Sequence, residues 1–333
     1  MGTYKGIKGF KVESLGSDPT LIQGDIWYNT ASNAYKYTAN VRAWATGTAY
    51  PVGLTYWPGG AGTATSCVVW KGYGGDPPGP GYIKYSNEFN GTAWSNQQDL
   101  NSNVGAYQSG FGTETAAVAG GGYTSVGGTA YNSTEEYNGV GWTSVNNMLN
   151  TMAMRGGVGT QTAGIEYGGA PMTTPPPSNL VEEYDGTNWT VAATLTNPRT
   201  ENTPHTGGSQ TAAMAVGGST PPQIALVEEY NGTGWTERGD INTPRSGMGG
   251  SGTTASMIVY GGNPVTGVTE SWDGSAWTEI ADLATARYAG ASAGTTSTSA
   301  LAILGGPIGP PSAFGANVEE WTVADAAKTV TTS

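Results

Sequence analysis

The chain has 333 residues and a net charge of −12, and it contains 54 glycines, 11 tryptophans and 18 tyrosines. Only 11% of the residues are charged, whereas disordered chains are rich in charge and poor in aromatic side chains. This composition predicts an all-β protein of short strands and tight turns. With 13 lysines and arginines in total, the chain lacks the basic patch that binds phosphate backbones, which disfavours nucleic-acid binding, and no nucleic-acid partner is expected.

Cysteine and histidine occur once each, at Cys67 and His205. An internal disulfide or a Cys/His zinc cluster needs more of them, so no metal and no cofactor are expected. Cys67 lies in an apolar run and is interpreted as a small core residue, and His205 lies in a polar loop-like stretch. No apolar stretch reaches the roughly 18 residues of a membrane span, and no secretory signal is recognised, so membrane insertion is not expected.

Residues 1–48 are expected to form a short β segment that attaches the protein to a larger assembly or completes the fold. They contain the stretch LIQGDIWYNTASNAYKYT. Within it, residues 24–30 resemble the Gly-Asp-Ile/Leu-Trp-Tyr-Asn-Thr hairpin common in bacteriophage tail-fibre and virion-surface proteins. The resemblance implies a virion structural protein, and it supplies no catalytic residue.

An internal repeat fills residues 49–325. An aromatic residue recurs every 42–49 residues, a period typical of solenoids and propellers. This aromatic falls at Phe89, Tyr137, Tyr184, Tyr230, Trp272 and Trp321. A tryptophan follows five residues later at Trp94, Trp142, Trp189, Trp235 and Trp277. We expect these tryptophans to be structural anchors, the last four largely buried between neighbouring units.

Each unit is predicted to contain four short strands joined by recurrent turns. A double glycine ends the second strand, at Gly74-Gly75, Gly120-Gly121, Gly168-Gly169, Gly217-Gly218, Gly261-Gly262 and Gly305-Gly306. An Asn-Gly or Asp-Gly pair separates the third and fourth strands, at Asn90-Gly91, Asn138-Gly139, Asp185-Gly186, Asn231-Gly232 and Asp273-Gly274. Such pairs favour a type I′ hairpin turn, in which both central residues have positive φ.

The double glycine, the aromatic residue, the tryptophan and a later arginine resemble the motif of kelch β-propellers, whose blades have about 50 residues. The resemblance implies a six-bladed kelch-like β-propeller, with residues 326–333 as a C-terminal tail. In the last unit, Ala326 stands where the tryptophan belongs. Upstream, Tyr37 and Trp44 imitate the same aromatic pair, so an N-terminal strand is predicted to complete the last blade and close the ring.

Arginines recur after three of the tryptophans, at Arg199, Arg245 and Arg287, and Arg155 follows at a longer spacing. They are predicted to tie the blades together, because buried charges occur mainly in pairs. The expected partners are acids of the third strands, such as Glu183, Glu229 and Glu320. The other interpretation is that the arginines converge on the axis as a carboxylate-binding cluster.

The segments after the double glycines vary in length and are rich in proline, so a propeller would gather them on one face. Proline stiffens such loops and lowers the entropy lost on binding. Tyrosine binds well because it loses little side-chain entropy. The candidate binding residues on this face are Tyr73, Tyr82, Tyr123 and Tyr131. In the competing interpretation, the loops are only soluble connectors between strands.

The favoured function is that of a non-enzymatic virion component, in the tail or on the head surface, whose loops bind a host-surface glycan or protein. Its expected partners are other virion proteins and further copies of the chain in a homo-oligomer. The alternative is a bacterial kelch-like module that binds carbohydrate or protein. A propeller hydrolase or lyase is the third and disfavoured class, because no catalytic set of residues stands out.

Overall fold

The computed structural model describes residues 12–22, 25–51, 54–74, 81–102, 106–124, 129–171, 177–201, 205–306 and 316–330. Every regular element in these ranges is a β-strand, and none of them holds a helix that would span a membrane. The chain divides into two compact units, Trp44–Trp321 and Met1–Ala43 with Thr322–Ser333. Strands β3 (Ala34–Thr46) and β29 (Val318–Thr329) run across this division. Residues 326–329, expected as a tail, therefore belong to a strand.

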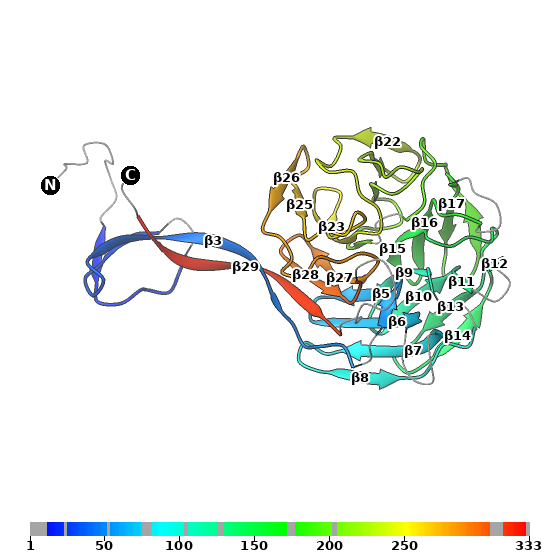
Figure 1. Cartoon of the computed structure of the whole chain (residues 1–333), viewed down its shortest axis with the longest axis horizontal. Helices are drawn as coiled ribbons and strands as arrows, with labels where there is room; N and C mark the ends of the chain where they lie inside the picture. Colours follow the sequence, from blue (N-terminus) through cyan, green and yellow to red (C-terminus); the bar gives the residue numbers. More distant parts are fainter. Residues whose placement is uncertain are drawn as a thin grey trace. The chain divides into compact units, whose positions relative to one another are not determined.

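The unit Trp44–Trp321 is a six-bladed β-propeller, in which small antiparallel sheets are arranged in a ring around a central axis (Figure 1). Blade 1 consists of β5 (Gly59–Thr63), β6 (Ser66–Gly74), β7 (Gly81–Phe89) and β8 (Trp94–Gln97). Blade 2 consists of β9 (Ser109–Thr113), β10 (Ala116–Gly120), β13 (Thr134–Tyr137) and β14 (Trp142–Val145). Blade 3 consists of β15 (Gly156–Thr160), β16 (Ala163–Tyr167), β17 (Val181–Tyr184) and β18 (Trp189–Val191).

The second half of the ring repeats this order. Blade 4 consists of β20 (Ala213–Val216), β21 (Val227–Tyr230) and β22 (Trp235–Arg238), and the short β19 (His205–Thr206) precedes it and pairs in parallel with β23. Blade 5 consists of β23 (Gly249–Thr253), β24 (Ser256–Tyr260), β25 (Thr269–Trp272) and β26 (Trp277–Ile280). Blade 6 consists of β27 (Ala291–Thr296), β28 (Ser299–Ile303), β29 and β3.

Three short strands lie outside this scheme in the propeller, and two more precede β3. Strand β4 (Leu54–Tyr56) pairs with β6, and β11 (Tyr123–Thr124) pairs with β12 (Thr129–Ala130). In the N-terminal unit, β1 (Glu13–Leu15) pairs in parallel with β2 (Ile26–Asn29), and β2 forms an antiparallel hairpin with β3.

The predicted closure of the ring by an N-terminal strand is confirmed, because β3 lies beside β29 as the outermost strand of blade 6. Trp44 of β3 packs on Trp321 with ring centroids 5.4 Å apart. Its indole N–H donates to Thr269 Oγ1 at 3.0 Å, just as the indole of Trp189 donates to Thr134 Oγ1. Trp44 therefore takes the position of the outer-strand tryptophan that the last repeat lacks.

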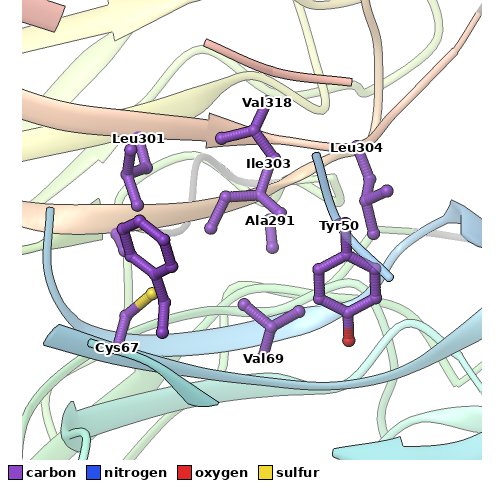
Figure 2. Close-up of a cluster of buried hydrophobic side chains, with 10 residues drawn as sticks. Tyr50, Cys67, Val69, Ala291, Leu301, Ile303, Leu304 and Val318 are labelled. Carbon is purple, nitrogen blue, oxygen red and sulfur yellow. The ribbon is translucent and has the colours of Figure 1, made fainter. Parts of the chain in front are cut away.

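The interface between the first and last blades is a cluster of buried apolar side chains (Figure 2). Cys67 and Val69 of β6 face Leu301 and Ile303 of β28. Tyr50 joins the cluster, and its hydroxyl donates to Asn87 Oδ1 at 2.7 Å. Cys67 is fully buried, as expected of a small core residue, and burial raises the pKa of its thiol.

The repeated tryptophans lie between blades to different depths. Trp142, Trp189 and Trp277 are buried, whereas Trp94 and Trp235 are half-buried. Trp235 packs against a buried cluster but is the least buried of the four tryptophans for which burial was expected. Its indole N–H donates to the carbonyl of Ala193 at 3.0 Å at an exposed position, instead of reaching a buried hydroxyl.

The expected hairpins between the third and fourth strands are present, but their turns are not of type I′. The strands pair up to Phe89↔Trp94 and Tyr230↔Trp235, which leaves four-residue loops. Gly232 has φ of +89°, and among the non-glycine residues with positive φ there is no Asn or Asp of these turns. Instead, the Asn231 side-chain oxygen accepts the N–H groups of Thr233 and Gly234 at 3.0 and 3.1 Å, an Asx turn.

The double glycines need a correction in blades 1, 2 and 6. The pairs of blades 3, 4 and 5 have φ near +60° and +100° in turn, and in blade 2 the residues with these values are Gly121 and Gly122, not Gly120-Gly121. In blade 6 the two residues with positive φ are Leu304 and Gly305, so Gly306 already follows the pair. In blade 1, the pairing Cys67↔Phe89 matches Ala117↔Tyr137. By this register, residues 71–72 of blade 1 occupy the position that the double glycine has in blade 2, and Gly74-Gly75 does not. Gly75 lies outside the described residues.

Replacing Gly232 by valine is expected to lower the free energy of unfolding by more than about 1 kcal/mol, because a β-branched residue at positive φ is strained. The added Cβ would also lie only 3.2 Å from the Thr211 side chain. Gly234→Val is the matched control, because no atom lies within 4 Å of its added Cβ and its φ is not positive. Urea unfolding of both variants tests this, and equal stabilities would contradict the turn geometry.

Replacing Trp44 by alanine is expected to destabilise the propeller by about 3 kcal/mol, at the lower end of the range for large aromatic truncations, because Trp44 is only half-buried. The loss opens a gap beside Trp321 and removes the hydrogen bond to Thr269. Tyr35→Ala, at a side chain 53% exposed on the same strand, serves as the control. Thermal unfolding that is equally unaffected in both variants would mean that β3 does not stabilise the ring.

Candidate functional site

Buried carboxylates on the third strands tie blades 2 to 6 to the chain that leads into each of them, and Asn87 takes this position in blade 1. Glu228 accepts the N–H groups of Thr196 and Asn197 at 2.7 and 3.1 Å. Arg199 donates to the same carboxylate at 2.6 Å, and both side chains are fully buried. The pairs Arg245–Glu270 and Arg287–Glu319 repeat this arrangement at 2.7 and 2.5 Å. The predicted role of these arginines is therefore confirmed, since each forms a buried ion pair.

The predicted acid partners, however, are wrong. Successive residues of a strand face opposite sides of the sheet, so the two adjacent glutamates of a third strand cannot share one arginine. Glu183 accepts instead from the hydroxyl of Tyr230 in the next blade at 2.9 Å. In the blade that follows Glu229, the position equivalent to Tyr230 is occupied by Trp272, which has no hydroxyl to donate. Glu229 pairs instead with Arg238 at 2.6 Å.

Blade 3 carries an additional buried acid. Glu166 of β16 stands where the other blades have alanine or valine, and it is fully buried. Arg155 lies between two carboxylates, with Nε 3.8 Å from Glu166 and Nη1 3.5 Å from Glu182. Burial raises the pKa of Glu166 to about 7, and the positive charge of Arg155 limits the rise. Glu166 is therefore a titratable group within the propeller at neutral pH.

Six residues in the left-handed backbone conformation, called here the left-handed residues, form a ring around the axis where the innermost strands begin. One residue of each blade contributes, with φ between +54° and +61°: Trp57, Tyr107, Met154, Glu201, Gly247 and Ala289. Hydrogen bonds connect them from blade to blade. The N–H of Tyr107 donates to the Trp57 carbonyl at 3.2 Å, and the N–H of Trp57 donates to the Ala289 carbonyl at 2.8 Å. Such conformations are costly for residues other than glycine and often mark functional positions.

The variable loops begin beside this ring. The residue before each left-handed position forms a β-bridge with the residue after the double glycine of the same blade. The bridges are Ala106↔Tyr123, Ala153↔Ala170, Thr200↔Ser219, Ser246↔Asn263 and Tyr288↔Gly306, and Tyr56↔Tyr73 is the counterpart in blade 1. The described starts of the loops therefore gather on one face, around the axis, as the sequence predicts.

Four aromatic rings form a row along the rim of the axis. Trp57 stacks on Tyr107 with centroids 5.0 Å apart, Tyr288 packs edge-on against Trp57 at 5.3 Å, and Tyr123 packs edge-on against Tyr107 at 5.8 Å. All four side chains are half-buried, so each keeps accessible surface. Sequence reasoning identified Tyr123 alone, because the other three lie in linkers whose residue types do not repeat.

A narrow hollow lies inside the rim. Trp57, Tyr107, Met154, Gln108 and Arg155 are among the residues that line it, and it leaves a cavity of about 30 Å³. This volume holds about two water molecules, whereas a pocket that encloses a small-molecule ligand has roughly 300–1,000 Å³. A ligand that binds to the described residues at the axis would therefore rest on the aromatic rim rather than inside the hollow.

The other predicted binding residues lie on the same face. Tyr73 and Tyr82 are directly paired across β6 and β7, and their side chains lie outside the described part of the structure. Tyr131 is 38% exposed. Loop residues 75–80, 125–128, 172–176 and 307–315 lie outside the described residues. The backbone of His205 lies in β19, and no group of three metal-ligating side chains occurs in the described ranges.

No protein-family model matches the chain, and no curated protein matches its sequence. Among solved structures, the chain is similar to YjhT, with a TM-score of 0.64 at 14% sequence identity. The likeness covers 85% of this chain and 100% of the YjhT chain. At this identity it supports the β-propeller fold alone, which is also the class that the strand order defines.

The buried acid of blade 3 predicts a pH dependence of stability. Between pH 4.5 and 7 the folded protein binds more protons at Glu166 than the unfolded chain does, so the free energy of unfolding falls as the pH rises through this window. Glu166→Gln removes this pH-dependent contribution to the free energy of unfolding. We expect the variant to be more stable than the native protein by about 1–3 kcal/mol at pH 8, and equally stable at pH 4.5.

Urea unfolding at the two pH values measures this difference. Glu229→Gln is the control, because this acid pairs with a side chain that is 45% exposed, and surface ion pairs contribute little. A Glu166→Gln variant whose stability relative to the native protein does not change with pH would contradict the assignment.

Proposed function

We propose that the protein is a non-enzymatic structural component of a bacteriophage virion, in the tail or on the head surface, which presents its loop face to the host. The observation that carries this proposal is the division of the chain. The variable loops start around the axis of the propeller, while both ends of the chain belong to the other unit. A rigid scaffold that presents variable loops is a common way to build a binding surface.

The hairpin of the N-terminal unit supports a role in attachment. Trp27 of the virion-type motif is buried, and Asp18 accepts from its indole and from Lys36 at 3.2 and 2.9 Å. The opposite face carries Ile26 and Tyr37, which are paired across β2 and β3 and are 50% and 39% exposed. Exposed apolar side chains grouped on one face fit an interface with another virion protein or a second copy of this chain.

The kelch-like assignment of the repeat is part of the same proposal. Its aromatic residue recurs in all six blades, its tryptophan in the first five, and its double glycine at one structural position in blades 2 to 5. The second candidate function is a bacterial kelch-like module that binds carbohydrate or protein. This module would bind through the same loop face, but it would not be incorporated into a virion. A hydrolase or lyase is the third class, and no cofactor is proposed.

The two units are expected to respond to mutation independently. Tyr73→Ala with Tyr123→Ala changes equivalent positions after the double glycines of blades 1 and 2, and it is expected to reduce adsorption of particles to host cells at least tenfold without changing incorporation. Ile26→Ser with Tyr37→Ser is expected to reduce incorporation of the protein into particles. Quantitative adsorption and immunoblots of purified particles measure the two effects.

Val140→Ser is the control, because Val140 is 74% exposed at the turn between β13 and β14, on the opposite face from the loops. Its adsorption and incorporation are expected to equal those of the native protein. Absence of the native protein from purified particles would favour the bacterial module. Normal adsorption of the double tyrosine variant would remove the binding role from this part of the loop face.

A further inference from the structure

The axial hollow contains a polar atom whose hydrogen bond is missing. Gln108 lines the hollow and is only 6% exposed. Its amide nitrogen donates to the Gly121 carbonyl at 3.1 Å, which fixes the orientation of the side chain, while its Oε1 has no hydrogen-bond partner among the residues that the structure describes. A buried acceptor without a donor is unfavourable. A ligand that brings a hydroxyl to this point would therefore gain free energy.

The rim around this acceptor is aromatic. The row Tyr288–Trp57–Tyr107–Tyr123 extends over blades 6, 1 and 2 and is held by the hydrogen-bonded ring of left-handed residues. Rings fixed in this way lose little entropy on binding. Their half-buried faces and edges suit a ligand that is itself a flat apolar surface with hydroxyl groups at its edge, which is the chemistry of a sugar ring.

The electrostatics of the site disfavour an acidic ligand. The positive charge that lines the hollow belongs to Arg155, which is already paired with Glu166 and Glu182 at 3.8 and 3.5 Å. Glu201, another member of the left-handed ring, adds a carboxylate that accepts from Ser246 Oγ at 2.6 Å. With a net charge of −12 on the chain, a carboxylated or sulfated sugar would be repelled.

We propose that the axial mouth is a subsite for one pyranose ring of a neutral glycan. The ring stacks on the Trp57–Tyr107 pair, and one hydroxyl or hydroxymethyl group enters the hollow and donates to Gln108 Oε1. The cavity of about 30 Å³ accepts such a substituent and excludes a whole sugar. This inference rests on the proposed binding role of the loop face, and it specifies the ligand class and the residues that touch it.

The experiment uses the full chain and immobilised neutral polysaccharides, namely a glucan, a galactan and a mannan, in affinity electrophoresis. We expect retardation by at least one of them. Trp57→Ala and Tyr107→Ala are each expected to weaken that binding at least tenfold. Alanine fits this conformation, because Ala289 has it at the same position of blade 6. Gln108→Met keeps the shape but removes both the acceptor and the donor to the Gly121 carbonyl, so it is expected to weaken binding and also to lower the melting temperature. Trp57→Ala and Tyr107→Ala leave that hydrogen bond in place, and they therefore carry the test.

Tyr131→Ala separates this inference from the general role of the loop face, because Tyr131 is exposed on that face but does not belong to the aromatic row. It is expected to bind neutral glycans normally. If Tyr131→Ala loses binding while Trp57→Ala and Tyr107→Ala keep it, the loop face binds but the axial subsite is refuted. Failure of the native protein to bind any of the three polysaccharides, or binding only to an acidic one, would also overturn the inference.

Discussion

Closure of the ring is the constraint on which the rest of this protein depends. Each blade is too small to bury both of its own faces, so it is covered only when it has a neighbour on each side. The last interface is made by segments from opposite ends of the propeller, with β3 beside β29 and Trp44 beside Trp321. Without β3, β29 would be an unpaired edge, which is a hazard for aggregation.

The closed ring also explains why the linkers are so regular. The linkers that lead into blades 2 to 6 each supply amide groups to a buried carboxylate of the blade that follows. Three of these linkers add a closely paired arginine, as with Arg199 and Glu228. A linker carbonyl accepts the N–H of the second glycine of the preceding blade, as the Arg199 carbonyl accepts the Gly169 N–H at 2.9 Å. The linkers are held from both sides, and this fixes the left-handed residues at the axis.

A scaffold held so firmly can carry different side chains at its mouth. Trp57, Tyr107 and Gly247 occupy the same backbone conformation, yet only the aromatic ones offer a surface for a ligand. The Pro-rich loops start directly after the residues that form β-bridges beside this ring. Variation at these positions changes what the face can bind without changing how blades pack, which is the property expected of a protein that meets a variable partner.

The sequence by itself determined the class and the number of blades, because turn glycines, strand aromatics and apolar runs act locally and recur at one period. It indicated an N-terminal closing strand through Tyr37 and Trp44, and the tertiary structure decided that this strand is β3. The sequence did not decide which of two adjacent glutamates meets an arginine, since strand alternation assigns them to opposite faces. It also did not reveal the row of Trp57, Tyr107 and Tyr288, or the burial of Glu166. Those depend on distances between blades, and such distances exist only after the ring has closed.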